Sequence, residues 1–292
     1  MTITTSEPTT TYSEITTRRA GTAGTWTALG VELRKLAAQK RARFALLGCL
    51  ISPIIVTVVL KGQQRPPKDT LYGRHIHSSG FGLALFVLTF AAQWLLPFLT
   101  ALVAGDIFAT EDHLGTWKTL LTRSASRTQV FAAKCLTAAI FAVSVLAVLA
   151  ASTILSGVLL VGRQSLVGLT GQLIPAKAAV ALVTASWATA LPPLLAFTAI
   201  AVLLSVLTRN PAIAVVGPIM IGLGSQLIGW LGGIDSERRL LPTTPFDAWH
   251  GLLTQHRYYD LITQGVLVSA GWIAICVGVA YLALRRRDIT GG

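Results

Sequence analysis

Residues 135–162 read CLTAAIFAVSVLAVLAASTILSGVLLVG, a run that contains no Asp, Glu, Lys, Arg or His. An α-helix needs about 20 consecutive apolar residues to cross the hydrocarbon core of a bilayer. This run exceeds that length without a single charged side chain. It therefore predicts a transmembrane helix.

Five further runs also lack charged side chains: residues 44–60, 81–105, 178–207, 212–234 and 261–284. Only 12% of the chain is charged, against about 25% in a soluble domain. One or two such runs could be buried helices of a soluble protein, but six in succession predict an all-α, polytopic membrane protein with six transmembrane helices. We expect residues 26–292 to form one transmembrane domain in the plasma or inner membrane.

Basic residues predict the orientation of the chain. Cytosolic segments carry an excess of Lys and Arg near the ends of transmembrane helices. Seven basic residues precede the first run, and Arg285, Arg286 and Arg287 follow the last. Both termini are therefore expected in the cytosol, which agrees with an even number of helices.

Two segments precede the first run. Residues 1–25 are polar and rich in Thr, which predicts a disordered cytosolic tail. Residues 26–44 place Trp26, Leu29 and Leu33 on one face of a helix, with basic residues elsewhere. This composition favours an amphipathic helix lying in the cytosolic interface; a helix exposed to the cytosol is the alternative.

Several classes of function find no support in the sequence. The net charge of +12 comes from short basic segments beside apolar runs, so no nucleic-acid partner is expected. No catalytic triad, supported carboxylate pair or phosphate-binding GxxxxGK[ST] loop is present, so the chain is not expected to be an enzyme. The cysteines are far apart, and no metal site is expected. Four histidines receive no role: His75, His77, His250 and His256.

Uncharged polar residues within the apolar runs are the candidates for a translocation path. Gln93, Ser225 and Gln226 could line such a path, or could form ordinary hydrogen bonds between helices. A carrier driven by an ion gradient usually needs ionisable groups at membrane depth, and the six runs contain none. The sequence therefore favours an energy source in a partner protein.

The segment before the last run mixes aromatic, proline and charged residues. Residues 234–260 read IDSERRLLPTTPFDAWHGLLTQHRYYD. This composition is typical of an interfacial or re-entrant element. An ordinary extracellular loop with aromatic residues at the interface is an equally good interpretation.

The segment between the second and third runs, residues 106–134, reads DIFATEDHLGTWKTLLTRSASRTQVFAAK. Acidic residues early in the segment favour a helix N-terminus, and its Leu and Trp residues are spaced to form an apolar helical face. The segment resembles the signature of ABC transporter permeases of the type-2 exporter class. The residues that carry this resemblance are Glu111, Gly115, Thr116, Leu120, Leu121, Arg127 and Lys134, with weaker support from Glu32-Leu-Arg-Lys35.

The resemblance implies that a separate cytosolic ATPase, which binds ATP and Mg, powers the permease. It implies two ATPase copies and a second permease copy, in a homodimer or a related heterodimer within membrane lipid. The segment would be a coupling helix that docks on the ATPase, through the following residues: Glu111, Asp112, Leu114, Gly115, Thr116, Trp117, Leu120, Leu121 and Arg127.

We therefore expect the transmembrane subunit of an ATP-driven exporter. An apolar path with few hydroxyl and amide groups suits an amphiphilic cargo, such as an antibiotic, a peptide or a lipid-like molecule. Two alternatives remain at this point. One is a gradient-driven carrier, and the other is a membrane partner or sensor of an ATPase that transports nothing.

Overall fold

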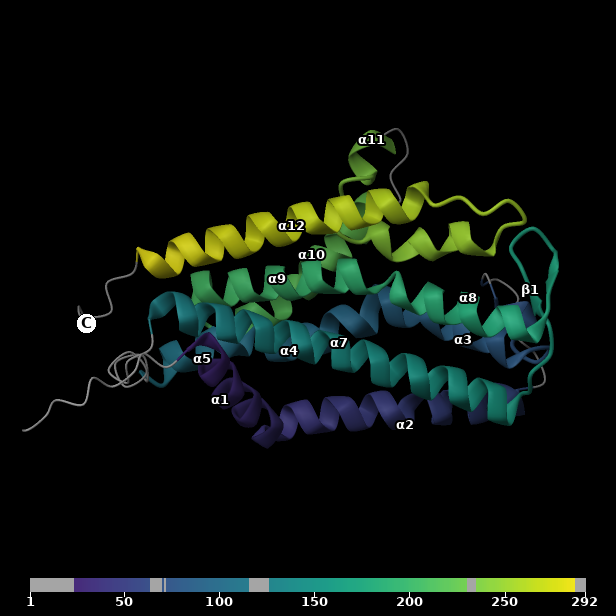
Figure 1. Ribbon diagram of the computed structural model, residues 1–292, viewed down its shortest axis with the longest axis horizontal. Helices are drawn as coiled ribbons and strands as arrows, with labels where there is room; N and C mark the ends of the chain where they lie inside the picture. Colours follow the sequence, from purple (N-terminus) through teal and green to yellow (C-terminus); the bar gives the residue numbers. More distant parts are fainter. Residues whose placement is uncertain (1–23, 64–69, 71, 116–125, 230–234, 287–292) are drawn as a thin grey trace, which may run out of the picture.

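The computed structural model describes residues 24–63, 70, 72–115, 126–229 and 235–286, most of which lie in helices packed side by side (Figure 1). Within these residues, six helical segments are long and apolar enough to cross a membrane: Lys40–Gly62, Gly80–His113, Arg127–Leu160, Ala176–Thr208, Pro211–Gly229 and Asp260–Arg285. The predicted all-α fold with six transmembrane helices is confirmed. The predicted tail lies almost wholly outside the described residues.

The chain begins with a short helix that leads into the first transmembrane helix. Helix α1 (Thr25–Ala38) ends at Gln39, and α2 (Lys40–Gly62) follows at once. The predicted amphipathic helix is therefore shorter than residues 26–44, because its last residues belong to α2. Arg43 explains part of this break, since its Nε donates 2.6 Å to the carbonyl of Ala37 and satisfies one of the free carbonyls at the end of α1.

The second transmembrane segment consists of four pieces. It comprises α3 (Gly80–Phe90), a π-helical turn η2 (Ala91–Leu95), α4 (Leu96–Ala104) and α5 (Asp106–His113). Pro97 accounts for the π turn, because it has no N–H to bond to the carbonyl of Gln93. The N–H of Leu96 instead reaches the carbonyl of Ala91, five residues back. Such turns often occur at functional sites.

The third transmembrane helix begins earlier than the apolar run predicted. Helix α7 (Arg127–Leu160) starts with a capping box, in which Ser126 accepts from the N–H of Gln129 and the Gln129 side chain accepts from that of Ser126. A capping box satisfies two of the free N–H groups at a helix start. Lys134 consequently lies inside the helix, about two turns from its beginning.

The fourth segment contains a turn, and the fifth follows directly. Helix α8 (Ala176–Ala188) and α9 (Leu191–Thr208) are separated by a short turn, with prolines in the first turn of α9, where proline is tolerated. Arg209, with a positive φ of 54°, reverses the chain. Helix α10 (Pro211–Gly229) then begins, and its predicted last residues, 230–234, lie outside the described part.

The remaining elements connect or complete these helices. Strands β1 (Leu166–Val167) and β2 (Leu173–Ile174) form an antiparallel hairpin between α7 and α8. Two short helical pieces, α11 (Asp235–Arg238) and the 3-10 helix η3 (Thr244–Leu253), precede the last helix, α12 (Asp260–Arg285). A further 3-10 turn, η1 (Gly73–His75), precedes α3.

Figure 1 shows α7 and α9 between α2 on one flank and α12 on the other. Helix α1, α5 and the end of α12 lie at one end of the bundle, and the hairpin lies at the opposite end. In the most apolar stretches of α2, α10 and α12, only 22%, 22% and 17% of the residues are buried. The corresponding share for the segment formed by α8 and α9 is 67%. The outer helices thus present apolar faces suited to lipid or to a second copy. The cytosolic position of both termini stays a prediction.

Candidate functional site

Lys134 lies at the centre of a buried group of charges near the α5 end of the bundle. It is only 1% exposed. Its Nζ donates to Glu32 Oε2 at 3.1 Å, to Glu111 Oε1 at 3.2 Å and to the carbonyl of Ile107 at 3.0 Å. These three acceptors supply a partner for each N–H of the ammonium group. Lys134 of α7 is therefore fully hydrogen-bonded to α1 and α5.

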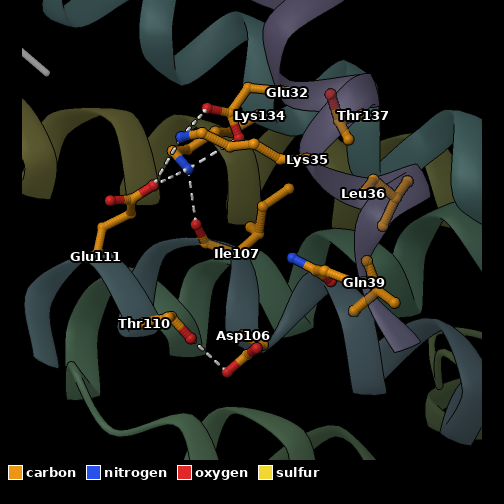
Figure 2. A pocket seen from close by; sticks show the side chains of 11 residues that line it. Glu32, Lys35, Leu36, Gln39, Asp106, Ile107, Thr110, Glu111, Lys134 and Thr137 are labelled. Atoms are coloured by element: carbon orange, nitrogen blue, oxygen red, sulfur yellow. Dashed lines mark hydrogen bonds and ion pairs between the residues drawn. The ribbon is translucent and has the colours of Figure 1, made fainter. Parts of the chain in front are cut away.

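A second lysine completes the group. Lys35 of α1 donates to Glu32 Oε1 at 3.0 Å and to Glu111 Oε1 at 3.2 Å. Figure 2 shows the two lysine nitrogens between the two carboxylates. We call Glu32, Lys35, Glu111 and Lys134 the charge cluster. It contains two acids and two bases, so its charges balance.

The electrostatics of the charge cluster favour the ionised form of Lys35. Burial alone lowers the pKa of Lys35, but its hydrogen bonds to Glu32 and Glu111 and their negative charges outweigh burial and raise the pKa above the ordinary value. Lys134 and Glu32 are 1% and 6% exposed. Removing one partner from a buried ion pair leaves the other charge uncompensated, which costs about 3–5 kcal/mol. The cluster therefore links its three helices tightly.

Helix α5 has further attachments near its beginning. The N–H groups of Phe108 and Ala109 donate to the hydroxyl of Ser205 in α9, at 3.2 and 2.9 Å. A side chain of another helix thus supplies acceptors for the first turn of α5. Asp106 accepts from Arg41 of α2 at 2.9 Å. Side chains of α1, α2, α7 and α9 therefore all hold α5.

Helix α5 also passes very close to α10. A Cβ on Gly105, the residue between α4 and α5, would lie 2.5 Å from the carbonyl oxygen of Ala214 in α10. Only glycine permits this approach of two backbones.

A small cavity of about 60 Å³ lies beside the charge cluster and is lined by Gln39, Thr110 and the cluster residues. It has room for water but not for a cargo molecule.

The predicted coupling residues are only partly described. Glu111 and Asp112 lie in the last turn of α5, Leu114 is 66% exposed, and Gly115 has a positive φ of 65°. Arg127 begins α7 and donates to the carbonyl of Arg285 at 3.5 Å. The others lie outside the described residues: Thr116, Trp117, Leu120 and Leu121. Their role as a docking helix stays a prediction.

Sequence reasoning missed most of the charge cluster as a site. It selected Glu111, but it treated Glu32, Lys35 and Lys134 only as parts of a motif. The spacing of three between Glu32 and Lys35 was one available signal, because residues three apart share a helix face. The contact between Glu32 and Lys134, 102 positions apart, left no local signal in the sequence.

The three residues proposed for a translocation path lie around one cavity. Gln93 of η2 meets Ser225 and Gln226 of α10 at a cavity of about 160 Å³, which Asp247 of η3 also lines. The π turn before Pro97 therefore occurs where Gln93 reaches this cavity. Whether the cavity belongs to a path for cargo stays a prediction.

The segment before α12 packs against the bundle. Phe246 and Trp249 of η3 are each 1% exposed, and η3 contacts α8, α9 and α12. This burial shows that η3 is part of the packed protein, and its re-entry into the membrane stays a prediction. A second cavity, about 450 Å³, lies between η3 and the start of α12 and shares Thr244 and Asp247 with the first.

Comparison with known proteins identifies the family. The sequence profile described as ABC-2 family transporter protein matches residues 28–224, which is more than half of the chain. The chain belongs to the ABC-2 transporter family. No curated protein matches it. The family resemblance and the multi-pass membrane location are thereby confirmed, and the protein is a membrane subunit of an ABC transporter.

Membership also implies that this permease associates with an ABC ATPase and is itself the transmembrane component. The matched range contains the whole charge cluster and the predicted coupling segment. It ends within α10, one residue before Ser225. The two polar cavities are therefore built largely by residues outside the match.

Proposed function

We propose that the permease is the membrane subunit of an ATP-driven exporter, and that its charge cluster transmits motion from a bound ATPase to the helices. The contact between Glu111 and buried Lys134 supports this proposal best. Glu111 is two residues from the end of α5, where the predicted coupling segment begins. A displacement of that segment would act directly on an ion pair that joins α5 to α7 and α1.

The attachments of α5 suggest how it moves. Ser205 holds its first turn, and Glu111 holds its last turn. A helix held at both ends is expected to move as a rigid body, without unwinding at its last turn. Closure of two ATPase subunits around ATP and Mg would shift α5, and the bonded helices α1, α7 and α9 would follow. In a dimer of permeases, this shift would switch access between the two sides of the membrane.

The cargo is proposed to be amphiphilic. Apolar side chains cover the exposed faces of α2, α10 and α12, whereas polar groups line the cavity at Gln93 and Gln226. An amphiphile can contact both kinds of surface. Export as the direction follows from the resemblance to type-2 exporters.

The test is transport by the permease reconstituted in vesicles with its ATPase. We expect ATP-dependent accumulation of an amphiphilic cargo, and we expect Glu111→Gln to reduce it at least tenfold. Glu237→Gln, a change at an exposed acid of α11, is the control and should transport normally.

Other outcomes separate the alternatives. Transport without the ATPase would identify a gradient-driven carrier. ATPase binding without any transport would identify a sensor or scaffold. Full transport by Glu111→Gln would contradict the proposed role of the charge cluster.

A further inference from the structure

Asp247 is the acidic group shared by the two polar cavities. The smaller cavity receives Gln93, Ser225 and Gln226 from the membrane helices, and the larger one opens toward Tyr258 and the start of α12. Asp247 therefore stands where a polar space inside the bundle adjoins one between η3 and α12. The larger cavity, about 450 Å³, is within the range of about 300–1,000 Å³ that small-molecule sites occupy.

The carboxyl of Asp247 differs in its partners from the acids near the α5 end of the bundle. Glu32, Asp106 and Glu111 each have a Lys or Arg nitrogen within 3.2 Å. Among the described residues, Asp247 forms no ion pair. Burial raises its pKa, although the charge of His250, a hydrogen bond with the Gln93 side chain and the charge of Arg238 oppose this rise. A buried carboxylate without a close cation is costly, and a cationic ligand would remove that cost.

His250 provides a second unused group. It lines the larger cavity, and its buried Nε2 has no hydrogen-bond partner among the described residues. Burial lowers its pKa below the ordinary value, although the charge of Asp247 and a hydrogen bond with its backbone oppose this fall. A neutral imidazole offers one acceptor nitrogen. An ammonium group between Asp247 and His250 would find two acceptors.

The other charged groups around Asp247 stand on the rims of the cavities. Arg238 borders the smaller cavity, and Arg239 and Asp260 border the larger one. All three residues are exposed, and of these only the charge of Arg238 acts on the pKa of Asp247. From α8 and α9, the described residues contribute no ionisable side chain to either cavity. Asp247 is thus the acid best placed to bind a ligand cation.

The wall of the larger cavity also offers apolar surface. Pro245, Ala248 and Leu261 line it beside the polar groups. An alkyl chain attached to the amine could lie against these residues. The site thus combines one carboxylate, a few hydrogen-bonding groups and an apolar wall, as expected for a receptor of a cationic amphiphile.

We propose that the two cavities bind the protonated amine of an amphiphilic cargo, with Asp247 as its counter-ion. That the amine is transported rests on the proposed function, whereas its binding to the cavities does not. The Thr244 hydroxyl, which both cavities share, accepts a further hydrogen bond from the amine. A ligand whose anionic group meets Arg238 is the competing occupant.

Binding is tested on the full-length permease in lipid nanodiscs, without ATPase or ATP. Isothermal titration compares octylamine, octanol and octyl sulfate, with empty nanodiscs subtracted. We expect Asp247→Asn to weaken octylamine binding about tenfold or more, as for the loss of a charged hydrogen bond, and to leave octanol binding within twofold. Glu237→Gln, the matched control, should change neither.

Two further measurements exclude a simple folding defect. Arg238→Gln removes the competing cation and should strengthen octylamine binding, a change that misfolding does not produce. Octylamine affinity of the unmodified permease should increase as pH rises and Asp247 ionises, since the amine stays protonated below about pH 10; in Asp247→Asn it should be flat.

Unchanged octylamine affinity in Asp247→Asn, an equal loss of octanol binding, or tighter binding of octyl sulfate than of octylamine would each overturn the proposal. The binding measurement does not depend on the ATPase. If the permease binds octylamine but transports nothing in the vesicle experiment, only the proposed export function is contradicted.

Discussion

The charge cluster and the Asp247 cavities both contain carboxylates, but in the part of the chain that the structure describes only those of the charge cluster form ion pairs. Glu32 and Glu111 are held by two lysines that satisfy their charges within the chain. Asp247 lines two cavities and forms no ion pair among the described residues, although the charges of His250 and Arg238 and the Gln93 side chain act on it. Carboxylates that are paired with lysines hold helices together rigidly. A carboxylate without an ion pair can instead bind a ligand cation. The difference assigns a mechanical task to the first region and a binding task to the second.

The largest effect is expected at Lys134. Lys134→Met should lower the free energy of unfolding by about 3–5 kcal/mol, because it leaves Glu32 and Glu111 buried without their shared cation. Thermal unfolding of the purified permease in detergent measures this loss as a lower Tm. The triple variant Glu32→Gln, Glu111→Gln, Lys134→Met should recover part of the Tm, since no unpaired acid remains. A Tm for Lys134→Met equal to that of the unmodified protein would show that the cluster does not hold the helices.

A smaller effect of opposite sign is expected at Asp247. Its folded-state pKa is raised from the usual 3.8, so the folded protein holds this proton more tightly than the unfolded chain. Stability should therefore fall as pH rises from about 4 through the folded-state pKa. Asp247→Asn should remove this decline and stabilise the permease by about 1 kcal/mol at neutral pH. Tm values of both proteins, measured between pH 4 and pH 8, check this; parallel curves would contradict the contrast between the two regions.

The smallest effect is expected for the exposed ion pair beside the charge cluster. Arg41 and Asp106 lie 2.9 Å apart, but the Arg41 side chain is 61% exposed. Exposed pairs contribute about 0–1 kcal/mol. Arg41→Ala should therefore change the Tm little, and 1 M salt should remove the remaining difference. A loss as large as that of Lys134→Met would mean that burial does not distinguish these pairs.

The helices could be predicted well, and the contacts between them poorly. Charge-free runs predicted six transmembrane helices because a bilayer core demands uninterrupted apolar residues. The start of α7 was placed too late, since Ser126 and Gln129 cap the helix before the apolar run begins. Lys134 was therefore assigned to the segment between the second and third runs. The structure shows it buried between three helices.

The candidate site was predicted in fragments. Gln93, Ser225 and Gln226 were selected only as polar residues in apolar runs, and the structure brings them to one cavity. Asp247 was not selected, because it lies in a segment whose composition also suits an ordinary loop. Its importance appears only when η3 packs against the bundle and brings it to the cavity that Gln93 and Gln226 line.

The sequence by itself determined that this chain is a six-helix membrane permease of the ABC-2 kind, because run lengths and a local motif are written in consecutive residues. Only the tertiary structure decided which charged residues form ion pairs with one another. Glu32 and Lys134 are 102 positions apart, and Asp247 is far from Gln93 in the chain. Such pairs depend on how the helices cross, which is set by packing over the whole bundle rather than by any local pattern.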